Sequence, residues 1–377
     1  MKLVFTGDVF LSTDNVPVLS TSLNELFAGA DAVCLNVEAP IDAAALPAAR
    51  KMGPSILQSR SVVGLIQMCH ATHVNLANNH IMDFGAEGLH QTTQVLGDYT
   101  CFGAGADFDS AYNPVYINAQ GVCIALHAFG EAQFGVLSDE REGGAGFAWF
   151  DHPRARAAIV ASRARADYVL VQVHAGLEMV ALPLPELRDR YRELIDLGAD
   201  LVIGHHPHVI QGSEEYKGKM IHYSLGNFYM DMFFGQDDPG SGAVLEVSID
   251  EGNLSSRLIP LTVEPGLIAI DQDAAQLQAY HSVNALLLDE PAYLREIDRI
   301  CEAFLRDVYS TYYEVALTGL GLVPNYVAFK RVARRIVGML LGRHRETGHA
   351  ELMLLHNIKI ETHRWVVERA LKNRVFS

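Results

Sequence analysis

The sequence contains few cysteines, and they lack the close pairing that metal or disulfide sites need. Five cysteines are scattered over 377 residues without any C-x-x-C spacing. This pattern excludes a thiolate zinc site of the ribbon type and argues against a disulfide framework, which normally uses an even number of cysteines. We therefore expect reduced, mostly buried thiols and a cytoplasmic location.

The sequence also lacks a long apolar segment. It contains no stretch of about 18 uncharged apolar residues, which predicts no transmembrane segment. The first residues, from Met1 to Asp8, lead directly into a predicted strand and a polar turn. On this pattern we expect no signal peptide, which would need an apolar core and a cleavage site.

Positive charge is scarce, because 29 lysines and arginines face 45 aspartates and glutamates, for a net charge of −16. Nucleic-acid binding relies on a basic face, so this balance excludes nucleic acid as a general partner. The carboxyl-terminal region differs, since residues 330–341 could form a basic amphipathic helix. Such a helix either packs on its own domain or serves as a peripheral contact for a membrane or a protein partner.

A repeating order of strand, loop and helix runs through about residue 230 and indicates an α/β layered domain with a largely parallel sheet. The hydrophobic pattern predicts strands at residues 3–6, 32–36, 72–76, 168–173 and 200–203, helices at residues 23–28, 59–70, 85–96, 153–166 and 186–197, and a hairpin at residues 115–117 and 122–128.

The remaining strands and the end of the chain follow a different pattern. Residues 220–223, 242–249 and 256–263 alternate between apolar and polar, which predicts a second, more antiparallel sheet. From about residue 271 the apolar residues recur at helical spacing. We therefore expect one domain over residues 1–264 and a helical extension over residues 271–377.

Three imidazoles follow the short apolar strand at residues 201–203, in the sequence Gly204-His205-His206-Pro207-His208. Buried histidines are costly unless their nitrogens are satisfied, and neutral imidazole is a common ligand of transition metals. A metal site therefore explains the cluster. The alternative is a loop whose histidines bond to the backbone.

Other predicted strands also end in polar side chains, and ligands of open α/β sheets collect outside such strand ends. The side chains are Asp8, Asn36, Glu38, Asn79, His80, Asp83, His174 and Asn227. Each has an ordinary structural explanation when taken singly, such as a turn, a cap or a core histidine. Together, donors without sulfur suit Mn, Fe or Zn, and they suit Mg less well because imidazoles are present.

The order of these motifs resembles the CapA family, also called PgsA, which is linked to capsule and poly-gamma-glutamate synthesis. The most specific segments are Leu76-Ala77-Asn78-Asn79-His80, the Gly204 to His208 turn and Ser224-Leu225-Gly226-Asn227-Phe228. The match covers about residues 1–264. It implies the calcineurin-like metallophosphoesterase fold, a four-layer αββα sandwich of two mixed sheets, here with a helical extension.

The resemblance also implies roles for individual residues in a centre of one or two divalent ions. Glu38 is the bridging candidate, and the other implied ligands are Asp8 and His208 for one ion and Asn79, His174 and His206 for the other. His80 would be the general acid or a partner of a phosphate oxygen. His205 would orient a ligand or contact substrate.

Three departures from the family pattern affect these roles. Phe10 stands where the phosphoesterase template has a ligand histidine, and Glu38 replaces a bridging aspartate. The motif His-Trp-Gly-x-Glu-Tyr is here His174-Ala175-Gly176-Leu177-Glu178-Met179. The departures at Phe10 and Glu38 weaken the expectation of two tightly held ions. The changed motif removes two aromatic groups from the expected pocket.

Three functions fit these observations. The first is a metal-dependent hydrolase that acts on a phosphoester or a glutamyl-type amide, so that its partner is a small anionic or peptide-like substrate. The second is a non-catalytic component for assembly or export of an anionic polymer. The third is a metal-dependent epimerase that acts on a peptide by proton abstraction.

Overall fold

A computed structural model of the chain describes residues 1–139, 144–235, 241–319 and 348–376. The chain divides into two compact units, one of residues 1–49 and 55–293 and the other of residues 50–54 and 294–377. Within the described ranges, no helix combines the length and the hydropathy needed to cross a bilayer. The basic segment 330–341 lies outside the described residues.

The first unit contains a mixed nine-stranded sheet with the order β2-β18-β17-β16-β1-β3-β4-β5, in which β15 also pairs with β1. The neighbouring strands β1, β3, β4 and β5 run parallel to one another, whereas β16 pairs antiparallel with β1, β17 with β16 and β18 with β17. Its strands are β1 (Lys2–Phe10), β2 (Val18–Leu19), β3 (Ala32–Val37), β4 (His73–Asn75), β5 (Thr100–Phe102), β15 (Asn227–Met230), β16 (Gly242–Asp250), β17 (Asn253–Glu264) and β18 (Leu267–Ile270).

A second sheet of six strands has the order β13-β14-β12-β11-β8-β7, with four parallel strands in the middle and an antiparallel strand at each edge. Its strands are β7 (Val115–Ala119), β8 (Val122–Gly130), β11 (Tyr168–His174), β12 (Leu201–His205), β13 (Ser213–Tyr216) and β14 (Lys219–His222). A small third sheet is formed by β6 (Ala104–Gly105), β9 (Val136–Leu137) and β10 (Gly146–Ala148).

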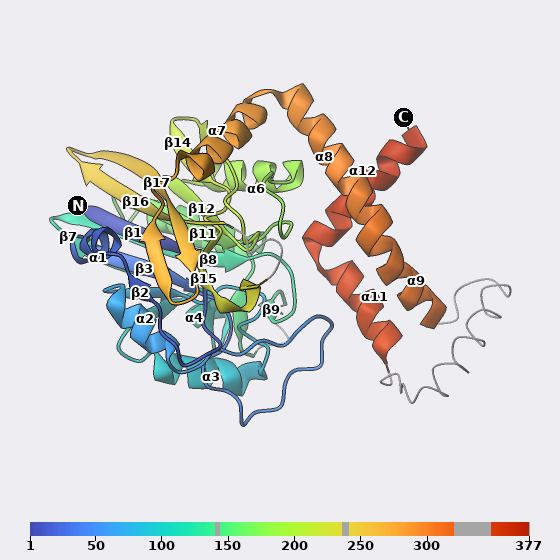
Figure 1. Cartoon of the computed structure of the whole chain (residues 1–377), viewed down its shortest axis with the longest axis horizontal. Coiled ribbons are helices and arrows are strands. Elements are labelled where there is room, and N and C mark those ends of the chain that lie inside the picture. Colours follow the sequence, from blue (N-terminus) through green and yellow to red (C-terminus); the bar gives the residue numbers. More distant parts are fainter. Residues whose placement is uncertain (140–143, 236–240, 320–347, 377) are drawn as a thin grey trace. The chain divides into compact units, whose positions relative to one another are not determined.

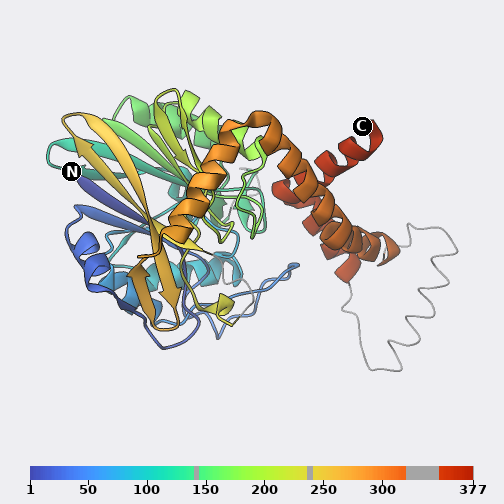
Figure 2. The same cartoon turned by 45° about the horizontal axis from the view of Figure 1, so that its top comes forward.

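Helices cover the outer faces of the two large sheets. Helices α5 and α6 pack on the second sheet, and α1 packs against the first. Figure 1 places α1, α2 and α3 on one side of the strands, and Figure 2 shows the blue and cyan helices, the blue strands, the green strands and the green helices as successive layers. The bounds are α1 (Thr21–Ala28), α2 (Val62–Met68), α3 (Gly85–Val95), α4 (Phe108–Tyr112), α5 (Pro153–Arg163), α6 (Pro185–Asp196) and α7 (Ala274–Leu288).

The four-layer fold class is confirmed, whereas the pairing predicted for several strands is wrong. The parallel strands do not form one sheet, since β1, β3, β4 and β5 lie in one and β8, β11, β12 and β14 in the other. The expected second antiparallel sheet does not form either, because β16 and β17 extend the first sheet while β14 pairs with β12. Most of these strands are buried on both faces, so their periodicity carries no information about their neighbours.

A buried ion pair fixes the last part of the first unit. Arg188 on α6 donates to Glu214 at 2.6 Å and to Glu290 at 3.1 Å, and its guanidinium lies 4.5 Å from the ring centre of Tyr293. The Arg188 side chain is 5% exposed. These contacts tie α6 both to β13, which carries Glu214, and to the residues that directly follow α7.

The second unit is helical. Helix α8 (Glu290–Phe304) enters it and continues through a π-helical turn (Leu305–Tyr309) into α9 (Ser310–Gly319). The helices α11 (His349–Lys359) and α12 (Glu361–Phe376) complete its described part. Arg374 bonds to Glu302 at 3.0 Å and Arg369 bonds to Asp298 at 3.3 Å, so ion pairs link α12 to α8.

A buried histidine on β8 predicts how the fold responds to acid. His127 is 1% exposed, its ring stacks on Phe129, and its Nε2 lies 3.0 Å from the Ser162 hydroxyl. Burial lowers the pKa of His127 to about 3, whereas an unfolded histidine titrates near 6.5. Between pH 6.5 and about 3, His127 therefore binds up to one proton more in the unfolded chain than in the folded one, and the free energy of unfolding falls as the pH falls.

We expect His127→Phe to retain about 2 kcal/mol of the stability that the wild type loses between pH 7 and pH 5. Urea unfolding at the two pH values measures this difference. His90→Phe, at an exposed position of α3, is the matched control and should follow the wild type. The explanation is wrong if His127→Phe shows the same pH dependence as the control.

Candidate metal centre

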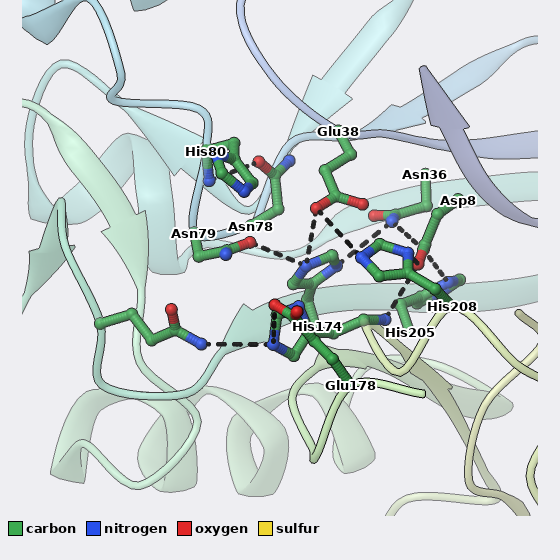
Figure 3. A network of polar contacts seen from close by, with 12 residues as sticks. Asp8, Asn36, Glu38, Asn78, Asn79, His80, His174, Glu178, His205 and His208 are labelled. Atoms are coloured by element: carbon green, nitrogen blue, oxygen red, sulfur yellow. Dashed lines mark hydrogen bonds and ion pairs between the residues drawn. The ribbon is translucent and has the colours of Figure 1, made fainter. Parts of the chain in front are cut away.

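Strands from both large sheets end at one place, and their last side chains face one another (Figure 3). The first sheet contributes Asp8 from β1 and Asn36 from β3, which lie opposite each other in register. The second contributes His174 from β11 and His205 from β12, which are also paired in register. The site therefore combines two separate sheets rather than one sheet edge.

Close backbone contacts require glycine where these strand ends meet. A Cβ added at Gly204 would overlap the carbonyl group of Tyr223. A Cβ added at Gly7 would overlap the carbonyl group of Gly226. Any larger residue at either position would push the strand ends apart, together with the polar side chains that follow them.

Positive φ angles mark the turns that carry the site. His206 has φ +97°, His208 has φ +58° and Ala39, directly after Glu38, has φ +99°. Such backbone costs about 1 to 3 kcal/mol per residue and persists only where the surrounding structure enforces it. The turn after β12 is thus held in a shape that aims His206 and His208 toward Asp8 and Glu38.

Asp8 is fully buried and surrounded by donors. Its Oδ1 accepts from Asn36 Nδ2 at 2.7 Å, and its Oδ2 accepts from the backbone N–H of His206 at 3.0 Å. The Nδ1 atoms of His205 and His208 each lie 3.4 Å from an Asp8 oxygen. Burial alone would raise the pKa of Asp8, but the nearby imidazoles of His205 and His208 outweigh it and hold this pKa well below its usual value.

Glu38 has a different environment, in which one carboxylate oxygen lacks a donor. Its Oε1 lies 3.7 Å from His174 Nε2 and 4.0 Å from His208 Nε2. Its buried Oε2 accepts no hydrogen bond from the described part of the chain. Burial raises the pKa of Glu38 to about 8. A buried carboxylate oxygen without a donor is costly, and a divalent cation would satisfy it.

The histidines divide into neutral and charged rings. Burial lowers the pKa of His174 well below its usual value and that of His206 to about 4, so both rings are neutral, as metal ligands must be. Burial acts the same way on His208, but the charges of Glu38 and Asp8 outweigh it and raise its pKa to about 10. His208 thus offsets the negative charge that Asp8 and Glu38 share, a role that a bound cation would take over.

Three groups of side chains have ligand atoms within 4.8 Å of one another in the described part of the chain. They are Asp8 with Glu38 and His208, Glu38 with His174 and His206, and Glu178 with His206 and His208. Asn79 Oδ1 lies 3.0 Å from His174 Nε2. The structure therefore brings all six predicted metal ligands together, with Glu38 shared by two groups.

The two residues predicted to act beside the metal lie in different surroundings. His205 is 0% exposed, between Asp8 and the Gln172 side chain at 3.3 Å, a position suited to orienting Asp8. His80 Nδ1 lies 2.8 Å from Asp83 Oδ2, and its side chain is partly exposed. Figure 3 shows His80 on the side of the site that carries Asn79 and Glu38.

Several residues at the site were not assigned a role from the sequence. Asn36 bonds to Asp8, Asn227 Oδ1 lies 3.0 Å from His208 Nδ1, and Gln133 Nε2 lies 3.4 Å from His206 Nε2. Asn36 has a sequence signal, because strand alternation puts it on the face of Glu38. The loop that carries Gln133 has no such signal.

The aromatic residue at position 10 does not take part in the site. Phe10 is buried in a small apolar cluster with Ala39 and Met230. Phe233 packs against this cluster, and its ring lies 5.1 Å from that of His208. One wall of the site is therefore apolar.

Comparison with known sequences identifies the family. The sequence profile of the family described as bacterial capsule synthesis protein PGA_cap matches residues 2–232. The chain belongs to this family. The resemblance to CapA noted from the sequence motifs is thereby confirmed, and the matched region contains every predicted metal ligand.

Two curated relatives match parts of the chain. The "Capsule biosynthesis protein CapA" of Bacillus anthracis is 33% identical over 201 residues, which cover 52% of this chain and 48% of that protein. The "PGA biosynthesis protein CapA" of Bacillus subtilis (strain 168) is 34% identical over 179 residues, or 46% of each chain. The chain thus spans about half the length of the curated relatives it matches.

Solved structures show a more distant likeness. A hypothetical protein from Thermus thermophilus has a TM-score of 0.43 and 15% identity, and the match covers 69% of this chain and 99% of that one. The NAD nucleotidase of Haemophilus influenzae has a TM-score of 0.40 and 13% identity, with coverage of 74% and 61%.

Proposed function

We propose that this member of the PGA_cap family is a metal-dependent hydrolase that acts on a phosphoester or a glutamyl-type amide. The observation that carries the proposal is the meeting of carboxylates and imidazoles from two sheets around the buried Glu38 carboxylate, whose Oε2 has no donor among the described residues. A buried group of this kind is stable when it binds a cation.

The residues fit one or two divalent ions. Asp8, Glu38 and His208 would hold one, and Glu38, Asn79, His174 and His206 would hold the other. Imidazole, amide and carboxylate donors without sulfur favour Mn, Fe or Zn over Mg. When bound, such ions activate water near neutral pH and stabilise charge on the substrate oxygen.

The side chains around this centre have separate tasks in the proposed reaction. Asn36 fixes the Asp8 carboxylate by a bond of 2.7 Å, and His205 supports it from the buried side. His80 gives a proton from its ring to the leaving group, while its contact with Asp83 orients the ring. These roles need a substrate whose leaving group develops negative charge as its bond breaks, such as a phosphoester or an amide.

The names of the curated relatives favour a place in capsule or poly-gamma-glutamate metabolism. They fit a small anionic or peptide-like substrate, and they equally fit a polymer assembly component that binds without turnover. The peptide epimerase is a third candidate, since it uses the same centre for proton abstraction.

Turnover assays on purified full-length chain distinguish these functions. We expect hydrolysis of p-nitrophenyl phosphate or of a γ-glutamyl anilide to rise about 10-fold or more on addition of Mn²⁺, Fe²⁺ or Zn²⁺, and to disappear on chelation. Bound metal without hydrolysis would contradict the proposal. Deuterium uptake at an α-carbon without bond cleavage would identify the epimerase instead.

A further inference from the structure

Glu178 lies on a turn that is fastened to the histidine turn after β12. The backbone N–H of Ala175 donates to the carbonyl of His205 at 3.0 Å, and that of Met179 donates to the carbonyl of Pro207 at 2.8 Å. Met179 has φ +58°, so this turn is also held in an unfavourable backbone conformation. The two turns therefore form one rigid unit, and the position of Glu178 relative to His206 is set by the backbone.

The Glu178 carboxylate faces the two imidazoles of that turn. Its Oε1 lies 3.8 Å from His206 Nε2, and ligand atoms of Glu178, His206 and His208 lie within 4.8 Å of one another. A distance of 3.8 Å is too long for a hydrogen bond. It fits two ligands of one ion, because metal bonds of about 2.1 Å place neighbouring ligand atoms about 3 to 4 Å apart.

Exposure separates Glu178 from the imidazoles that it faces. Its side chain is 60% exposed, whereas those of His206 and His208 are 4% and 6% exposed. His206 Nδ1 is buried without a hydrogen-bond partner in the described part of the chain. The two imidazoles thus form the inner wall of a site whose outer side, toward solvent, is provided by the Glu178 carboxylate.

A second carboxylate, that of Glu131, also lies near His206. Glu131 Oε1 lies 3.9 Å from His206 Nε2, but Glu131 is 1% exposed and accepts from Gln133 Nε2 at 2.7 Å. Phe10, in its apolar cluster, offers no ligand atom. Of these two carboxylates, Glu178 is the one whose ligand atom groups with those of His206 and His208 among the described residues.

We propose that Glu178 is a metal ligand, which binds the solvent side of the divalent transition-metal ion assigned above to His206. This inference rests on the metal centre of the proposed function and adds to it a ligand on the solvent side, where substrate must approach. Imidazole and carboxylate donors without sulfur suit Zn²⁺, Mn²⁺ or Fe²⁺.

The test measures metal binding rather than activity. Full-length wild type and Glu178→Gln are stripped of metal and titrated calorimetrically with Mn²⁺ and Zn²⁺. We expect Glu178→Gln to raise the dissociation constant of one binding step about 10-fold or more and to leave that of any second step unchanged. The absorption spectrum of bound Co²⁺ should also change, which a purely structural role would not cause.

Matched variants separate this inference from the proposed function. Glu215→Gln, at an exposed position of β13, should bind both metals like the wild type. Equal melting temperatures of the metal-free proteins show that Glu178→Gln folds normally. Wild-type binding with no change in Glu178→Gln overturns only the role of Glu178, whereas a wild type that binds neither metal overturns the metal centre itself.

Discussion

Glu38→Gln is expected to lose most of the metal that the purified wild type carries. Glu38 belongs to two of the three ligand groups, and its carboxylate lies between His174 and His208. Glutamine keeps the shape but removes the charge that attracts a cation. We expect the dissociation constant to rise about 100-fold or more for every ion bound, with a comparable loss of metal-dependent turnover.

Metal content by mass spectrometry and calorimetric titration measure this effect. Asp8→Asn should weaken only one binding step, because Asp8 occurs in a single group with Glu38 and His208. Glu246→Gln serves as control, since Glu246 lies on the same sheet but pairs with Lys2 and Arg257. Wild-type metal content in Glu38→Gln would refute the assignment of Glu38 as the shared ligand.

His80→Gln is expected to slow the hydrolysis of esters with poor leaving groups about 100-fold or more, because a positioned general acid contributes factors of this size. His80 Nδ1 contacts the buried Asp83 carboxylate at 2.8 Å, and Asp83 also accepts from the backbone N–H of Ile56 at 2.8 Å. This arrangement fixes the ring, so Nε2 is the atom that would give the proton to the leaving group.

Comparison of leaving groups tests this role. An alkyl phosphate needs a proton on the departing oxygen, whereas p-nitrophenolate leaves without one, so His80→Gln should affect the alkyl ester far more. Metal content should not change, and His90→Gln, on the exposed face of α3, should behave as the wild type. An equal loss on both esters would assign His80 to substrate binding rather than to proton transfer.

Much of the fold could be predicted because the hydrophobic pattern reports burial along the chain. The helices near Gly85, Pro153 and Pro185 begin where glycine or proline and the apolar period indicate, and the hairpin of β7 and β8 forms as expected. Strand pairing could not be predicted in the same way. β16 and β17 extend the first sheet, although their sequence does not distinguish this place from a separate sheet.

The candidate ligands were also visible in the sequence, because polar side chains recur after several of the short apolar strands, although each has an ordinary structural explanation when taken singly. Asp8, Glu38, His174 and the turn from Gly204 to His208 all follow this rule. Their assignment as ligands stays a prediction. Glu178 differs, because it lies on a loop whose path depends on contacts with the rest of the chain.

The sequence by itself therefore determined the family, the layered fold class and the residue types that could bind a cation. Only the tertiary structure decided which strands each of the two sheets contains, and that the turn with Glu178 is bonded to the turn with His206. The physical reason is that residue type and periodicity act locally. The distances between side chains depend on how distant segments pack, as where Gly204 lies against the backbone of Tyr223.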